Sequence, residues 1–472
     1  MLIENLNGPT ETDRINKLVR DFVGDGISEK GLIEQEIQRF LKSPKRKLML
    51  TGIEYYHNRT DIRKKVRKLK GIELQNKSNQ KLAHAFTRKI TDQKVGYLLS
   101  KNPTISSDSD VHSEILNKDI FSREMLQTLK QLGEFAVTEG IAWLHPYVSA
   151  NGALDFKIFR GHEVLPFYVD DKHYDLDSAV RIYNAYEYHN DQRTEVTKVE
   201  HYTTDGVYYY ILEGNALVPD VPRGVHSNYL EIDGDGHNWD KVPLVPFRYN
   251  SAEQPLVDLI KSLVDVYDLI ASTDSDLIID LPNFIIKLIN YGGEDLDEFL
   301  LHLNELNVVS VDENGDVGHV KVDPDTANTN LALQRTREAI YEFGRGVDVQ
   351  NEDMGNVSGE ALKFRYADLD LDCNVIENLF QVSLERLMYF VNTHLNLTNK
   401  GDFTNESFEI IFNRDIIINE QRVIEMCRDS VGVLDDATIR KNHPWYVPEV
   451  EERLEKQNDD DYSIPPQGDL DE

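Results

Sequence analysis

The chain of 472 residues has few of the side chains that build covalent or metal-based frameworks. Cys373 and Cys427 are its two cysteines. Two thiols are too few for a disulfide framework or for a zinc site with four thiolate ligands. We therefore interpret both as reduced thiols of a cytosolic protein.

Long apolar runs are also missing. No window approaches the roughly 18 uncharged apolar residues of a membrane-spanning helix, and residues 1–8 lack the basic and then apolar pattern of a secretory signal. The sequence predicts no membrane partner. Hydrophobic residues at 40% and charged residues at 28% are typical of a globular chain with a sizeable core, and the length suggests roughly three domains.

The organising motifs of common enzymes do not occur. There is no G-x-x-x-x-G-K-[ST] phosphate loop, no G-x-G-x-x-G loop, no H-E-x-x-H and no G-x-S-x-G. Asp312, Asn314 and Asp316 imitate the start of a calcium loop, but Gly315 falls too early and Asp323 replaces the glutamate at position 12. A plain hairpin turn is the favoured interpretation. The sequence thus predicts no catalytic residue, no metal and no cofactor, although chance pairs of carboxylates leave a nuclease open as an alternative.

Positive charge is scarce and unevenly spread. The formal net charge is −32, yet residues 45–101 hold 16 basic and 4 acidic residues. The rest of the chain is therefore strongly acidic and cannot hold DNA as a repressor does, because phosphate binding needs clustered Lys and Arg. An acidic wall would repel DNA and keep it from sticking, which suits a conduit through which DNA passes. The basic stretch has three interpretations: contact with DNA, contact with an acidic neighbour, which we favour, or a solvated helix face.

The hydrophobic pattern predicts an α+β fold. Helical spacing occurs over residues 16–42, 79–100 and 121–139. The period then changes to two, and Asn151-Gly152 between the runs 141–148 and 154–159 predicts a hairpin. Further strands are expected over 180–188, 196–203, 207–212 and 242–249.

An amphipathic helix is predicted over residues 256–280. The apolar residues that share one face are Leu259, Leu263, Val266, Ile270 and Leu277. The acidic residues that share another are Asp258, Asp265, Asp276 and Asp280. Taken alone, such an acidic stripe is usually a solvated face.

A small α/β insertion follows, and then a second helical part. A strand is expected over 283–291 and a hairpin that pairs 308–311 with 317–322. A helix is expected over 328–346 and a polar loop over 347–359. A long helix is expected over 359–397, a strand over 408–412, and helices over 419–431 and 435–442. The tail from residue 457 is acidic and reads as disordered.

Several segments of the sequence resemble segments that occur in one protein family. They are Tyr55-Tyr56 with Arg59, Asp61 and Ile62; residues 79–82 and 89–99 (KITDQKVGYLL for the latter); residues 240–250 (DKVPLVPFRYN); residues 256–271; and residues 408–419 with 437–444. Their order, over nearly the whole chain, is similar to that of the portal proteins of tailed phages, especially siphophages of Gram-positive hosts.

The resemblance implies a portal architecture within the α+β class, in a ring of about twelve subunits. Carried onto this chain, it gives a wing (1–254 and 360–415), a helical stem (255–280 and 326–346), a small α/β clip (281–325), a tunnel loop (347–359), a helical crown (416–453) and a disordered tail (454–472). It also implies a location at the portal vertex of the virion, after assembly in the host cytoplasm.

The resemblance further implies residue roles and partners. Asp258, Asp265, Asp276 and Asp280 would line the channel as acidic rings beside which the duplex slides. The residues expected in the tunnel loop are Asp348, Gln350, Asn351, Glu352, Asp353 and Asn356. Ile285, Ile286 and Leu288 would form an interface between clips. The implied partners are further copies of the chain, double-stranded DNA bound without sequence specificity, terminase, head-completion adaptor proteins, and the major capsid and scaffolding proteins. The rival interpretations are a phage nuclease and another structural virion protein.

Overall fold

A computed structural model describes residues 29–73, 77–170, 173–189, 192–232, 234–280, 285–289, 295, 316–320, 326–348, 359–414, 424, 427–441, 443 and 446. These residues divide into two units, one of residues 1–348 with 368–414 and the other of residues 349–367 with 415–472. Each unit is considered by itself. The described part is a mixture of helices and strands, which confirms the predicted α+β class.

Four helices lead into the first sheet. They are α2 (Glu29–Lys42), α3 (Pro44–Tyr56), α4 (Phe86–Leu99) and α6 (Arg123–Glu139). The Ser43 hydroxyl caps α3 by accepting the Arg46 N–H at 3.1 Å. Helix α6 ends at Gly140, whose φ of 86° and close approach to the Glu253 carbonyl require a residue without a Cβ. This turn directs the chain into the first strand of the sheet.

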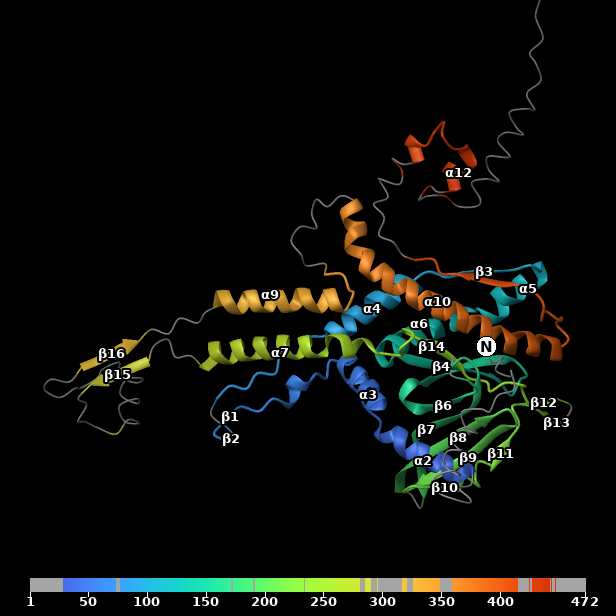
Figure 1. Cartoon of the computed structure of the whole chain (residues 1–472), viewed down its shortest axis with the longest axis horizontal. Helices are drawn as coiled ribbons and strands as arrows, with labels where there is room; N and C mark the ends of the chain where they lie inside the picture. The colour runs from blue at the N-terminus through green and yellow to red at the C-terminus, as the bar shows by residue number, and fades with distance from the viewer. Residues whose placement is uncertain are drawn as a thin grey trace, which may run out of the picture. The chain divides into compact units, whose positions relative to one another are not determined.

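Two antiparallel sheets form the body (Figure 1). The smaller has the order β14 (Val245–Arg248), β4 (Ile141–Val148), β5 (Leu154–Arg160). The larger has the path β10 (Ala216–Pro219), β9 (Gly206–Glu213), β8 (Gln192–Thr203), β7 (Leu176–His189), β6 (Val164–Tyr168). The hairpin predicted around Asn151-Gly152 is confirmed, with Ala142 opposite Arg160 and Val148 opposite Leu154.

The core lies between these sheets and the helices. One buried cluster joins Trp143 and Phe159 of the smaller sheet to Tyr202 of the larger one. Another packs Ile33 and Ile37 of α2 against the larger sheet. Burial of these apolar faces supplies most of the driving force for folding of the body.

Two packed helices, α7 (Leu256–Asp280) and α9 (Thr326–Phe343), lead away from the body (Figure 1). Helix α10 (Gly359–Leu397) follows, and its residues from 368 onward belong to the same unit. The bounds predicted for α7 and α10 are confirmed to the residue, and those of α9 to within three residues. None of the helices that the structure describes is long and apolar enough to cross a membrane.

Short elements complete the description. Strand β17 (Phe408–Ile411) pairs with β3 (Thr104–Ser107), beside the short helix α5 (Asp110–Ile115). Strand β15 (Ile285–Ile289) pairs with β16 (Asp316–Val320). The predicted partner of β16, residues 308–311, lies outside the described residues. Helix α12 (Asp436–Lys441) lies in the other unit. The predicted tail lies outside the residues that the structure describes.

One predicted helix is wrong over its first seven residues. Residues 79–100 have helical spacing, but the helix begins at Phe86, and residues 77–85 are not helical. Their conformation depends on contacts with α7, nearly 190 residues away in sequence.

Candidate functional site: an arm along a helix and a pinned loop

The segment between α3 and α4 forms an arm along α7, described for residues 57–73 and 77–85 (Figure 1). It includes the short hairpin of β1 (Lys68–Leu69) and β2 (Ile72–Glu73). Figure 1 shows the arm on the opposite side of α7 from α9. The arm holds nine Lys or Arg and two acidic residues, whereas α7 holds six aspartates and one lysine. Opposite charges therefore meet along the helix within one chain.

Backbone hydrogen bonds fix the arm to α7 at regular intervals. Alternate N–H groups donate to side-chain acceptors four residues apart on the helix: Ser78 to Asp280 at 2.9 Å, Gln80 to Asp276 at 2.6 Å, Leu82 to the Ser272 hydroxyl at 3.0 Å, and His84 to Asp268 at 3.0 Å. We call this set the amide ladder.

The ladder works because two spacings match. Two residues of an extended chain advance about 6.6 Å, and four residues of an α-helix advance about 6 Å. An extended segment can therefore present every second N–H to every fourth side chain of a helix. The acceptor row of Asp268, Ser272, Asp276 and Asp280 has this spacing.

Side chains of the arm complete the contact. Lys65 Nζ lies 2.7 Å from Asp276 Oδ2, and Arg67 pairs with Asp280. Thr60 Oγ1 donates to Asp268 Oδ2 at 2.6 Å. Asp268 and Asp276 are almost fully buried, at 0% and 1% exposure. Each buried carboxylate thus has charged or polar partners, as such groups require.

The electrostatic effect on these carboxylates is clear in direction. Burial alone would raise the pKa of Asp276, but the Gln80 N–H and the Lys65 ammonium lower it below its ordinary value. The Ser78 N–H and Arg67 likewise lower the pKa of Asp280. Near the N-terminal end of the arm, hydrogen bonds from Lys261 and Lys64 lower the pKa of Asp61 to about 2. All three groups are held in the charged form.

Three aspartates of the predicted acidic stripe have partners within the chain, and their place at a channel stays a prediction. Asp265 accepts hydrogen bonds from Tyr55 and Lys261. Asp276 forms an ion pair with Lys65, and Asp280 forms one with Arg67. The basic stretch was expected to meet another molecule, yet part of it pairs with the helix of its own chain. Asp258 is exposed and its role at a channel stays a prediction.

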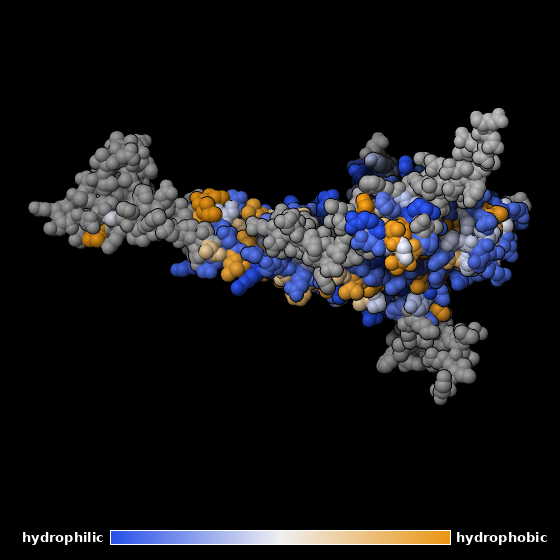
Figure 2. All heavy atoms as spheres, turned by 90° about the horizontal axis from the view of Figure 1, so that it is seen from above, coloured by the Kyte–Doolittle hydropathy of each residue, from blue (hydrophilic) through white to orange (hydrophobic). Residues whose placement is uncertain are grey.

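The apolar side of α7 remains open. Leu259, Val266 and Leu277 are 42%, 47% and 47% exposed and share one face at 100° per residue. Figure 2 shows hydrophobic residues on the surface of the helical pair. The first half of the helix buries apolar residues (Leu256, Val257, Ile260 and Val264), whereas its second half buries Asp268, Ser272 and Asp276 under the arm and leaves Leu277 exposed.

Residues 344–348, which follow α9, are pinned by side chains from three helices. The Gln93 amide donates to the Val347 carbonyl at 2.7 Å and accepts the Val347 N–H at 3.1 Å. Asp348 forms a bidentate ion pair with Arg337, at 2.6 and 2.7 Å. The start of the predicted tunnel loop is thus fixed, and Asp348 is held against α9. Gln350, Asn351, Glu352, Asp353 and Asn356 lie outside the described residues.

A buried ion pair lies beneath this segment. Lys94 is fully buried, and its Nζ lies 2.6 Å from Asp372 Oδ2 on α10 and 3.2 Å from the Arg345 carbonyl. Asp372 also accepts from the Tyr249 hydroxyl at 2.7 Å and from Arg345 at 3.2 Å. Burial lowers the pKa of the Lys94 ammonium, and the charge of Asp372 opposes that shift. The cluster ties α4, α10 and the segment after α9 together.

The predicted clip interface is described through its backbone alone. Ile285, Ile286 and Leu288 lie in β15, opposite Val320, His319 and Val317 of β16. The strand is confirmed, and the role of these side chains stays a prediction.

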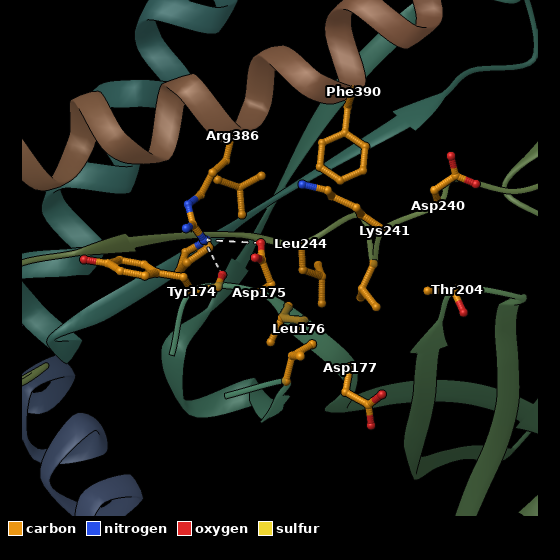
Figure 3. A pocket seen from close by; sticks show the side chains of 14 residues that line it. Tyr174, Asp175, Leu176, Asp177, Thr204, Asp240, Lys241, Leu244, Arg386 and Phe390 are labelled. Atoms are coloured by element: carbon orange, nitrogen blue, oxygen red, sulfur yellow. Dashed lines mark hydrogen bonds and ion pairs between the residues drawn. The ribbon is translucent and has the colours of Figure 1, made fainter. Parts of the chain in front are cut away.

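A pocket of about 340 Å³ lies between the sheets and α10 (Figure 3). Arg386 donates to the Tyr174 carbonyl there and lies 4.0 Å from Asp175. Phe390, Lys241 and Asp177 line other parts of the wall. The pocket holds no nucleophile beside a base. Among the described residues, no group of three or more His, Cys, Asp or Glu is placed to hold a metal ion.

Comparison with known proteins decides the family. The family model described as "Phage portal protein, SPP1 Gp6-like" matches residues 43–463. The chain belongs to this family of phage portal proteins. The portal protein of Bacillus phage SPP1 is 28% identical over 464 residues, with 95% of this chain and 90% of the relative covered. The portal protein of Clostridium phage phiCD119 is 26% identical over 432 residues, with 86% and 91% covered.

A solved structure, the neck of an empty GTA particle computed with C6 symmetry, matches 76% of this portal subunit and 89% of its own chain. Its TM-score of 0.43 and identity of 9% are too low to carry an argument. The family match confirms the resemblance seen in the sequence, and with it a ring subunit for DNA packaging.

Sequence reasoning missed Asp268, Ser272, Lys94 and Asp372. The first two could have been found, because with Asp276 and Asp280 they repeat every fourth residue. Lys94 and Asp372 are 278 residues apart and carry no local signal.

Proposed function

We propose that this portal subunit builds its ring through the helical pair α7–α9, which surrounds a channel for duplex DNA at one vertex of the capsid. In this proposal residues 1–254 and 360–415 are the wing, α7 and α9 the stem, 281–325 the clip, 347–359 the tunnel loop, 416–453 the crown and 454–472 the tail. The subunit performs no catalysis. It assembles in the host cytoplasm with capsid and scaffolding proteins. The ring then binds terminase during packaging and the adaptor proteins afterwards.

The open apolar stripe of α7 carries the proposal. Leu259, Val266 and Leu277 are 42–47% exposed along one face of a 25-residue helix. Contiguous exposed apolar surface of this kind marks a protein interface. In a ring, each α7 would bury this stripe against helices of the next subunit.

The corrected electrostatics fit a channel wall of moderate charge. The arm neutralises much of the aspartate row of α7, so the stem does not carry the dense acidic rings that the sequence suggested. Exposed Asp258 on α7 and Glu338 and Glu342 on α9 remain to repel phosphates. A wall that does not bind phosphates tightly lets the duplex slide.

The proposal is tested by placing charge in the stripe. Val266→Glu combined with Leu277→Glu should prevent ring assembly, because the two carboxylates would be buried without partners at the interface. The matched control combines Val111→Glu with Val221→Glu, which alters two valines of the body that are 59% and 72% exposed. Mass photometry should show rings for the control and monomers for the stripe variant. Rings of normal stability in the stripe variant would rule out this interface.

A further inference from the structure

The arm has more basic side chains than those that pair with the aspartates of α7. Lys65 and Arg67 face the aspartates of the helix, and Lys64 pairs with Asp61 of the arm itself. The side chains of four other lysines are exposed and make no hydrogen bond or ion pair within the part of the chain that the structure describes: Lys68, Lys70, Lys77 and Lys81. We call them the lysine row. Glu73, opposite Lys68 in the β1–β2 hairpin, is its one acidic neighbour on that hairpin.

The lysine row stands on a backbone that is already fixed. Lys77 directly precedes the amide ladder, and Lys81 lies within it. The donors of the ladder are the N–H groups of Ser78, Gln80, Leu82 and His84. Lys68 and Lys70 lie in the hairpin next to Arg67, which is tied to Asp280. A partner that binds a fixed backbone loses less conformational entropy than one that must order a free loop. The row is thus built as a contact surface rather than as a solvated loop.

Charge identifies the partner. The whole chain has a net charge of −32 although residues 45–101 are strongly basic, so the rest of another copy carries a large net negative charge. A row of lysines would repel itself across a two-fold axis, where the same surface meets itself. In a ring, the contact joins two different faces, and a basic face can meet an acidic one.

We infer that the lysine row is one face of the contact between neighbouring subunits, and that it binds an acidic surface of a second copy of this chain. The inference rests on the proposed ring and adds the second element of the interface. The apolar stripe of α7 supplies buried area, and the lysine row supplies the charge match that selects the orientation of the neighbour.

The first experiment compares two fourfold variants of equal charge. The row variant changes Lys68, Lys70, Lys77 and Lys81 to Glu. The control changes Lys30, Lys42, Lys47 and Lys130, which are also exposed, to Glu. Both lower the formal charge by the same amount, so general repulsion is matched. Mass photometry over a range of protein and salt concentrations should show that the row variant needs at least about tenfold more protein to form rings than the control does.

The second experiment uses the unaltered sequence, so it does not depend on the folding of a variant. Rings are assembled from light and isotopically heavy subunits and treated with a carbodiimide, which joins a lysine directly to a carboxylate. Mass spectrometry should find links between the lysine row of one copy and Asp or Glu of the other. Links confined to single copies, with equal assembly of the two fourfold variants, would overturn the inference.

Duplex DNA is the competing partner, because phosphates also attract lysines. It is tested with a fluorescent 30-base-pair duplex. If the row variant assembles like the control but loses binding of the duplex, the row contacts DNA and the inference is wrong. If no rings form even from the unaltered chain, the proposed function itself fails, which is a different result from either of these.

Discussion

Single residues at two places hold the structure that the rest of the molecule depends on. On α7, Asp276 accepts from both a backbone N–H and the Lys65 ammonium while 1% exposed. Under the segment after α9, Lys94 and Asp372 form a buried pair. Removal of one member of such a pair leaves the other buried without a partner, which costs more than the net contribution of the pair itself.

The amide ladder predicts alternating hydrogen exchange along the arm. The N–H groups of Ser78, Gln80, Leu82 and His84 should exchange slowly, and those of the intervening residues 79, 81 and 83 quickly, since no ladder bond holds them. Exchange measured by mass spectrometry with single-residue fragmentation shows the pattern directly. Uniform exchange from 78 to 84 would contradict the ladder.

Asp276→Ala should remove that protection. A hydrogen bond to a charged group contributes roughly 1.5–3 kcal/mol, so exchange at Gln80 should rise by more than about tenfold. Asp274→Ala is the control, because Asp274 is on the same turn of α7 but outside the ladder. Equal exchange in the two variants would show that Asp276 does not hold the arm.

The pair beneath the loop predicts a second local effect. Asp372→Ala leaves the Lys94 ammonium buried without its carboxylate, at a cost of about 3–5 kcal/mol. Exchange of residues 344–348 should rise strongly, and thermal unfolding should move to lower temperature. Asp368→Ala, one turn earlier on α10 and exposed, should change neither. A normal exchange rate in the Asp372 variant would argue against pinning of the loop by this cluster.

At the scale of elements, the arm and α7 behave as one unit whose stability depends on pH. The pKa values of Asp276 and Asp280 lie below the ordinary value of 3.8. A carboxyl with a lowered pKa stabilises the folded state fully above its unfolded pKa, and this stabilisation is lost as the pH falls through the folded pKa. The arm should therefore stay attached above about pH 4 and detach in stronger acid.

Pepsin, which is active in acid, measures that detachment. Cleavage within residues 60–84 should begin only as the pH falls below the ordinary carboxyl range. The double variant Asp276→Asn, Asp280→Asn should be cleaved at every pH in the series, since its side chains cannot titrate. Identical pH profiles for the two proteins would contradict the role of these carboxylates.

Elements also show how far the sequence could predict the fold. The bounds of α7 and α10 follow from their own periodicity, and the β4–β5 hairpin follows from Asn151-Gly152. The arm does not, because residues 79–85 have helical spacing and become extended only through acceptors on α7. The contact between the arm and the aspartate row of α7 was not predicted either, since such a row usually faces water and here it faces the arm. The clip and crown stay predictions wherever they fall outside the described residues.

At the scale of the whole molecule, this portal subunit leaves surfaces that a single copy cannot satisfy. The apolar stripe of α7 is open, and the lysine row faces outward from a chain of net charge −32. Both are expected of a subunit whose neighbours complete it. Because the contact joins different faces, assembly should continue beyond a dimer, and it gives a ring when the rotation between neighbouring subunits closes.

Electron microscopy of the purified full-length chain tests this claim most directly. We predict closed rings with a central channel, with α7 and α9 of each subunit packed against the next and the stripe of Leu259, Val266 and Leu277 buried between them. Monomers or dimers alone, over a range of salt and protein concentrations, would contradict the account, as would rings in which this stripe faces solvent.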